Sequence, residues 1–150
     1  MSSRVKSLAL AVGMVMASTL APVSAAPAQS LIGVAIYKVV SQGCVEDVSD
    51  GRGQTRCDHR GPITVTVVES GYGRGPQAFL NGAPLAYASR SSLCEFRPPF
   101  VPCTGGQVVG YSFSYVFELD DQQIATFSVS DRSLTAPVQT MGAAIQIASH

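Results

Sequence analysis

Residues 111–129 read YSFSYVFELDDQQIATFSV, and this stretch decides the fold class. Aromatic residues occupy every second position of its first half: Tyr111, Phe113, Tyr115 and Phe117. After an acidic interruption, a second run places apolar residues at alternate positions: Ala125, Phe127 and Val129. Side chains two positions apart lie on the same face of a β-strand. The stretch therefore predicts two strands, each with one apolar face, joined by a hairpin turn at residues 120–122.

The same two-residue alternation recurs on both sides of this stretch. Residues 31–40 are rich in Val, Ile and Tyr, and residues 63–68 alternate Val and Ile with Thr, so they predict two earlier strands. The pair Asn81–Gly82 predicts a tight turn, because both residues accept a positive φ. A last strand would carry Ala143, Ile145 and Ile147. We therefore expect an all-β domain, a small antiparallel β-sandwich or barrel-like fold of roughly six to seven strands.

The N-terminal segment has the composition of a secretory signal peptide. Two basic residues precede a largely apolar run at 8–20, and residues 23–25 (Val-Ser-Ala) are small, as a cleavage site requires. The apolar run is shorter than the about 18 to 20 residues that a membrane span needs. We therefore expect residues 1–25 to be removed and residues 26–150 to form one secreted or periplasmic domain without a membrane span.

Charge and composition limit the classes of partner. Without the two basic residues of the signal segment, eight of the ten Lys and Arg residues remain against ten Asp and Glu, a net charge of −2. General binding to nucleic acid needs a basic excess, so no nucleic-acid partner is expected. No motif implies a cofactor. The expected partner is an unidentified protein or an envelope ligand.

Four cysteines remain after the signal segment: Cys44, Cys57, Cys94 and Cys103. An even number in an exported protein predicts two disulfides, for which three pairings exist. We favour pairing between near neighbours, because each bond would then close a short loop rich in Gly or Pro. Structural zinc sites usually pair cysteines two to four residues apart. The spacings here are wider, so no metal site is expected.

The segment CEFRPPFVPC, residues 94–103, is the first candidate binding site. If its two cysteines pair, the ring closure and three prolines would hold the segment in an extended form. Rigid presentation reduces the entropy lost on binding. The candidate contact residues are Phe96, Arg97 and Phe100. The alternative is an ordinary stapled loop in which Phe96 and Phe100 fold back onto the domain.

This segment resembles the disulfide-closed loops of Bowman–Birk and subtilisin-type protease inhibitors. In those loops a disulfide cysteine stands two residues before the primary specificity residue, as Cys94 stands before Phe96 here. The resemblance covers only residues 94–103. It implies that Phe96 would fill the protease pocket and that Phe96–Arg97 would be the scissile bond. Arg97 occupies the place where Bowman–Birk loops usually carry serine.

The segment around Cys57 is the second candidate site. Arg56 and Arg60 could bind a phosphate or carboxylate through paired hydrogen bonds. His59, next to Asp58, could act as a general base, because histidine titrates near neutral pH. The alternative is a solvated loop whose charges pair with one another.

These patterns lead to a ranked set of function classes. The first is an exported, non-enzymatic binding or interaction module, because loops on a rigid scaffold commonly carry recognition and no catalytic set is assembled. Protease inhibition through the Cys94–Cys103 loop is its narrower form. The competing class is a small secreted hydrolase or nuclease that uses His59 or His150 with Glu69 or Glu118. A structural envelope protein is the last.

Overall fold

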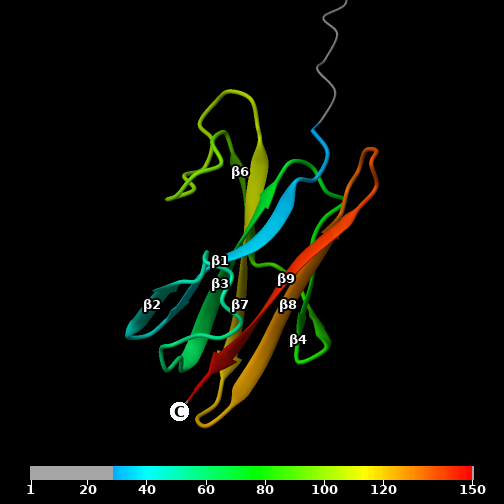
Figure 1. The fold of residues 1–150 in the computed structure, drawn as a ribbon. Coiled ribbons are helices and arrows are strands. Elements are labelled where there is room, and N and C mark those ends of the chain that lie inside the picture. Colours follow the sequence, from blue (N-terminus) through cyan, green and yellow to red (C-terminus); the bar gives the residue numbers. More distant parts are fainter. Residues whose placement is uncertain (1–28, 150) are drawn as a thin grey trace, which may run out of the picture.

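The computed structural model describes residues 29–149, which form a two-layer β-sandwich without a helix (Figure 1). The predicted signal segment, residues 1–25, and His150 lie outside the described residues. The strands are β1 (Gly33–Ser41), β2 (Cys44–Asp47), β3 (Gly61–Ser70), β4 (Gln77–Leu80), β5 (Ala83–Leu85), β6 (Ser89–Leu93), β7 (Gly110–Leu119), β8 (Ile124–Arg132) and β9 (Thr140–Ala148).

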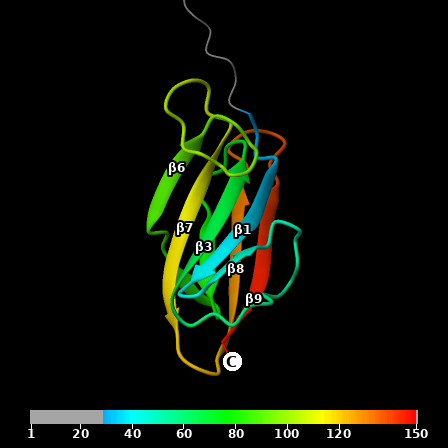
Figure 2. The same ribbon diagram turned by 90° about the vertical axis from the view of Figure 1, so that its left-hand side faces the viewer.

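The strands form two antiparallel sheets, which confirms the predicted class. One sheet has the order β2-β1-β3-β7-β6, and the other has the order β5-β4-β8-β9. Figures 1 and 2 show the two sheets stacked face to face. The nine strands exceed the expected number partly because β2 and β6 contain only four and five residues. Alternation over so few residues gives little signal in the sequence.

The predicted hairpin between residues 111–119 and 124–129 is wrong. Its two strands, β7 and β8, belong to different sheets, so the chain crosses from one layer to the other after Leu119. The rings meet across the core instead, with centroids 5.3 Å apart for Tyr115–Phe127 and 6.3 Å for Phe117–Phe127. The physical reason is that two strands with one apolar face each have two ways to bury those faces. They can pair within one sheet, or they can pack face to face from two different sheets. By contrast, Asn81 and Gly82 do join paired strands, with φ of 51° and 82°.

The core lies between the sheets and is built from alternate residues of the long strands. On β3 and β7 these residues include Ile63, Val65, Val67, Phe113, Tyr115 and Phe117. On β8 and β9 they include Ala125, Phe127, Val129, Ile145 and Ile147. These faces are the ones that the sequence alternation predicted.

Both predicted disulfides are present in the favoured pairing. The Cα atoms are 6.3 Å apart in Cys44–Cys57 and 5.2 Å apart in Cys94–Cys103. Two disulfides are consistent with an oxidising location outside the cytoplasm. Residues 29–149 include no helix with the length and apolar character of a membrane span.

Candidate functional site

Two strands of opposite sheets, β3 and β8, each carry an acidic side chain near the end of the buried face. The inward residues before them are apolar: Ile63, Val65 and Val67 on β3, and Ala125, Phe127 and Val129 on β8. Glu69 and Asp131 continue these two series, and they are only 2% and 4% exposed. A buried carboxyl group is costly unless it is protonated or well paired. This pair is therefore the most unusual feature of the core.

A glycine-containing loop covers the two carboxyl groups. The Gly73 N–H donates to Glu69 Oε1 at 2.8 Å, and the Gly75 N–H donates to Asp131 Oδ2 at 3.2 Å. A Cβ on Gly73 would overlap the Asp131 carboxylate, so the loop approaches this closely only because residue 73 is glycine. Within this cluster, the loop donates no hydrogen bond to Glu69 Oε2 or to the Tyr115 hydroxyl oxygen. The loop thus satisfies only part of the polar cluster.

Glu69 keeps its proton at neutral pH. Burial raises the pKa of Glu69 to about 8, and the charge of Asp131 and a hydrogen bond between the two side chains add to this shift. The Gly73 N–H and the Arg90 charge oppose the shift less strongly. Burial also raises the pKa of Tyr115 to about 12, so its hydroxyl stays protonated. Glu69 is therefore uncharged near pH 7 and hydrogen-bonded to Asp131.

A cleft opens beside Glu69. Its lining comprises Glu69, Gly73, Arg74, Gly75, Tyr87, Arg90 and Phe113. The Arg90 guanidinium carbon lies 3.8 Å from the ring centroid of Tyr111, an arrangement that fixes its direction. Tyr87 is 46% exposed and rests edge-on against Phe113, with ring centroids 5.3 Å apart.

Tyr87 also borders a second hollow, so the polar cleft and an apolar groove meet at its ring. The groove is lined by Pro76, Gln77, Ala78, Phe79, Pro84, Leu85, Ala86 and Tyr87. An acidic oxygen, two guanidinium groups, an exposed ring and an apolar surface therefore adjoin. Few convergent polar groups beside apolar walls are typical of small-molecule sites.

Asp131 is not among the sites expected from sequence, and Glu69 appears there only as an acidic partner for a histidine. The available signal was the strand alternation itself. Each acid occupies the position at which the next buried apolar residue would stand. Acids at two such positions indicate inward-facing carboxyl groups. That they meet depends on which strands face each other, which the alternation does not encode.

The Cys94–Cys103 loop is anchored rather than extended. The Phe100 N–H donates to the Arg97 carbonyl at 2.9 Å and closes a tight turn, and Phe100 has a φ of 54°. Its ring packs edge-on against Tyr37 of β1, with centroids 4.7 Å apart. The expected extended form is therefore wrong for residues 97–100. The cause is the contact of the half-buried Phe100 ring with Tyr37, at a bulge in β1 that pairing rules alone do not predict.

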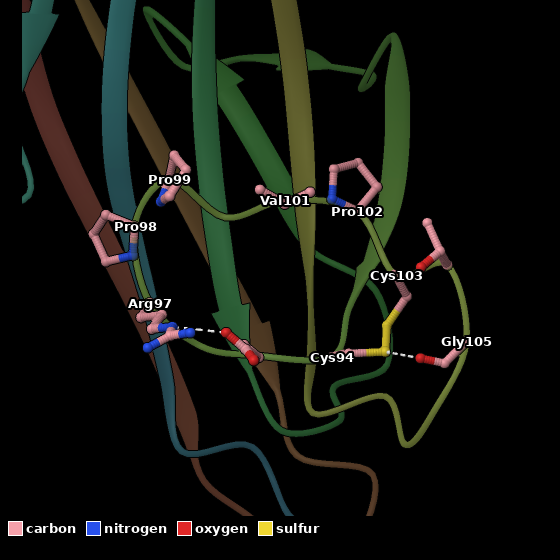
Figure 3. Close-up of a pocket in the computed structure, with 10 residues that line it drawn as sticks. Cys94, Arg97, Pro98, Pro99, Val101, Pro102, Cys103 and Gly105 are labelled. Carbon is pink, nitrogen blue, oxygen red and sulfur yellow. Dashed lines mark hydrogen bonds and ion pairs between the residues drawn. A yellow bond between two sulfur atoms is a disulfide. The ribbon is translucent and has the colours of Figure 1, made fainter.

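Most other residues of this loop are exposed, and Figure 3 shows the course of the loop from the disulfide past Arg97. Phe96 is 42% exposed although its ring centroid is 5.2 Å from that of Phe100. Arg97 points to solvent and pairs with Glu95, with Nε 2.7 Å from the carboxylate oxygen. Val101, which the sequence did not single out, is 65% exposed. The loop thus exposes apolar and charged side chains, while the disulfide and the contact between Phe100 and Tyr37 hold its backbone.

The structure does not bring the expected residues of the Cys57 segment together. His59 is completely buried, and its Nδ1 lies 2.8 Å from Ser41 Oγ, so a substrate cannot reach the ring. Its other ring nitrogen faces Glu46 rather than Asp58. Arg60 pairs with Asp58 at 2.7 Å near the surface. The Arg56 backbone N–H is used inside the loop, where it donates to Glu46 at 2.8 Å.

Comparison with known protein families assigns the chain to one family. Residues 26–147 match the family described as Domain of unknown function (DUF4879). The chain belongs to this family. No curated protein and no solved structure matches it. The function of this DUF4879 protein is therefore inferred from the geometry of its own sites.

Proposed function

We propose that this DUF4879 protein is an exported, non-enzymatic binding module whose ligand occupies the cleft beside Glu69. The observation that carries the proposal is the buried Glu69–Asp131 pair beside a cleft that also contains Arg74, Tyr87 and Arg90. A buried acidic pair is costly unless it is well hydrogen-bonded. A ligand in the cleft that donates hydrogen bonds to the pair would reduce that cost. The two disulfides and the predicted signal segment support export to the periplasm or the medium.

The chemistry of the cleft favours an uncharged ligand with hydroxyl or amide donors and an apolar face. The negative charge of Asp131 partly offsets the charges of Arg74 and Arg90, so the cleft selects neither a strong anion nor a strong cation. The exposed Tyr87 ring offers a surface for stacking. Phe79 and Leu85 extend that surface along the groove. A carbohydrate has these properties.

The test is a titration of ¹⁵N-labelled protein with neutral cello-, chito- and malto-oligosaccharides, followed by chemical shifts. At least one series should shift the amides of residues 71–75 and 87–90. Glu69→Leu should weaken that binding about tenfold or more, because leucine has a similar volume but offers the ligand no hydrogen-bond acceptor. Glu118→Leu, on the exposed face of β7, is the matched control and should leave binding unchanged.

Two outcomes of this titration would contradict the proposal. No shift at millimolar concentration of any series would rule out a carbohydrate in the cleft. Release of shorter sugars during the titration would show an enzyme instead of a binding module.

A second candidate is recognition of a protein, such as a protease, through the Cys94–Cys103 loop. The exposed apolar side chains of Phe96 and Val101 on an anchored loop favour it. Titration of chymotrypsin-, subtilisin- and trypsin-like proteases with the oxidised protein should then give stoichiometric loss of activity. Phe96→Ala should abolish the inhibition, whereas Val45→Asp, at an exposed residue of β2, should preserve it. Full protease activity at large excess would discard inhibition.

A further inference from the structure

We propose that reduction of the Cys44–Cys57 disulfide converts this pair, together with Glu46 and His59, into a zinc-binding site. The inference is independent of the proposed ligand cleft. It concerns a separate cluster, in which β2 meets the segment that follows it. Before reduction the two sulfurs are bonded to each other. The disulfide and the metal are therefore mutually exclusive cross-links between Cys44 and Cys57.

The four side chains converge as a metal site requires. Each cysteine stands two residues before a second donor, Glu46 on β2 and His59 in the later segment. One ligand atom of each residue lies within 4.8 Å of every other. Zinc bonds of about 2.0–2.3 Å in a tetrahedron place ligand atoms roughly 3–4 Å apart. After reduction, a small increase in the distance between the two sulfurs gives the four ligand atoms this spacing.

The histidine is already oriented for a metal. His59 is 0% exposed, and Ser41 Oγ lies 2.8 Å from its Nδ1. This contact leaves Nε2 directed at the cluster, 3.9 Å from Cys44 Sγ and 3.5 Å from Glu46 Oε2. In zinc proteins a ligating histidine almost always makes such an outer hydrogen bond through its other nitrogen. Ser41 therefore acts as a positioning residue.

The carboxylate is held in the same way. The Cys57 N–H donates to Glu46 Oε2 at 3.1 Å, and Arg52 donates to Oε1 at 2.9 Å. The Arg56 N–H also donates to Glu46 Oε1, at 2.8 Å. These contacts fix the carboxylate beside the two sulfurs, where a metal ligand would be needed.

The chemistry of the conversion balances. A dithiol reductant supplies two electrons, the Cys44–Cys57 bond breaks, two thiols form and the reductant becomes a disulfide. Zinc then displaces both thiol protons to solvent and binds two thiolates, one imidazole nitrogen and one carboxylate oxygen. Two sulfurs with a nitrogen and an oxygen form a donor set suited to Zn²⁺.

The second disulfide provides an internal contrast. Residues 29–149 contain one group of three or more His, Cys, Asp or Glu donors that meets this geometry, and it is the cluster at Cys44. Cys94 instead has the Gly105 carbonyl near its sulfur, at 3.1 Å. The wide spacing between the cysteines predicted no zinc site. The informative spacing is that between each cysteine and its non-cysteine neighbour.

The experiment uses the full domain with Cys94→Ser and Cys103→Ser, so that only one thiol pair remains. After reduction with a phosphine, which supplies the same two electrons, Co²⁺ is titrated and its spectrum recorded. We expect one Co²⁺ per chain with the intense visible bands of tetrahedral geometry and the near-ultraviolet bands of thiolate ligands. Zn²⁺ should displace it, and the oxidised protein should give no such spectrum.

Variants assign the ligands. His59→Ala and Glu46→Ala should each weaken metal binding about tenfold or more, and Ser41→Ala should weaken it to a smaller extent. Asp58→Asn, between two proposed ligands but outside the cluster, is the matched control and should bind as the parent does. Circular dichroism monitors folding of the reduced chain; refolding on addition of Zn²⁺ would also support the site. An octahedral spectrum, no binding, or unchanged affinity in His59→Ala would overturn it.

Discussion

Raising the pH from 5 to 8.5 is expected to lower the free energy of unfolding by about 3–5 kcal/mol, at about 1.4 kcal/mol per unit of pKa difference. The cause is the Glu69–Asp131 pair, where the pKa of Glu69 is about 8 in the folded chain against an ordinary value of 4.5. Between these values the folded protein holds a proton that the unfolded chain has released. Stability is therefore full below pH 4.5 and is lost as the pH rises through 8.

The measurement is denaturant unfolding at fixed pH steps, with both disulfides intact. Glu69→Gln should remove most of the slope, because a neutral amide neither binds nor releases the proton. Glu118→Gln should retain it. The pH range of the effect distinguishes this pair from Glu46. The pKa of Glu46 is lowered, so its contribution to the free energy of unfolding is lost only under more acidic conditions. A wild-type stability that stays constant from pH 5 to 8.5 would show that the pair does not hold its proton in the folded state.

This proton links stability to the proposed ligand site. Loss of the proton places a second negative charge next to Tyr115 and beneath the loop that carries Gly73. Both neighbours are buried or closely packed, so the added charge has little solvent to stabilise it. Ligand binding to the folded chain should therefore change as the pH rises through 8, whereas the stability already falls between pH 4.5 and 8.

The sequence predicted the strands and their buried faces because a two-residue period is a local property. The aromatic series from Tyr111 to Phe117 is buried on the side that its alternation indicated. The same period does not say whether two such strands pair edge to edge or face each other. That ambiguity explains the false hairpin between β7 and β8. Cysteine pairing was predicted because short loops between near neighbours are easily closed.

The sites were harder to predict because they depend on contacts between distant strands. Glu69 and Asp131 are 62 positions apart, and only the packing of the two sheets, one containing β3 and the other β8, brings them together. Likewise Phe100 turns inward because a bulge in β1 offers Tyr37 as a partner. The Cys57 segment was predicted as charged and solvated, which fits Arg60 but not the buried His59.

Gly110→Ala is expected to lower the free energy of unfolding by about 3 kcal/mol, at the upper end for overpacking in a rigid site. Gly110 begins β7 and is paired with Ser70 of β3, the residue after Glu69. A Cβ on Gly110 would overlap the backbone carbonyl oxygen of Glu69. The two strands are central in their sheet, so relief of this overlap requires the ladder to open.

Gly33→Ala is the matched control for this change. Gly33 is paired with the same Ser70 from the opposite side, on β1, but a Cβ there meets no atom within 4 Å. The control should therefore unfold close to the wild-type midpoint, or slightly above it, because alanine restricts the unfolded chain. Gly110→Ala should in addition lose part of the pH dependence, since opening the ladder moves Glu69 away from Asp131. Equal midpoints for the two variants would show that β3 and β7 separate easily at this end, and a carboxyl pair carried by such a movable strand could not hold its proton to pH 8.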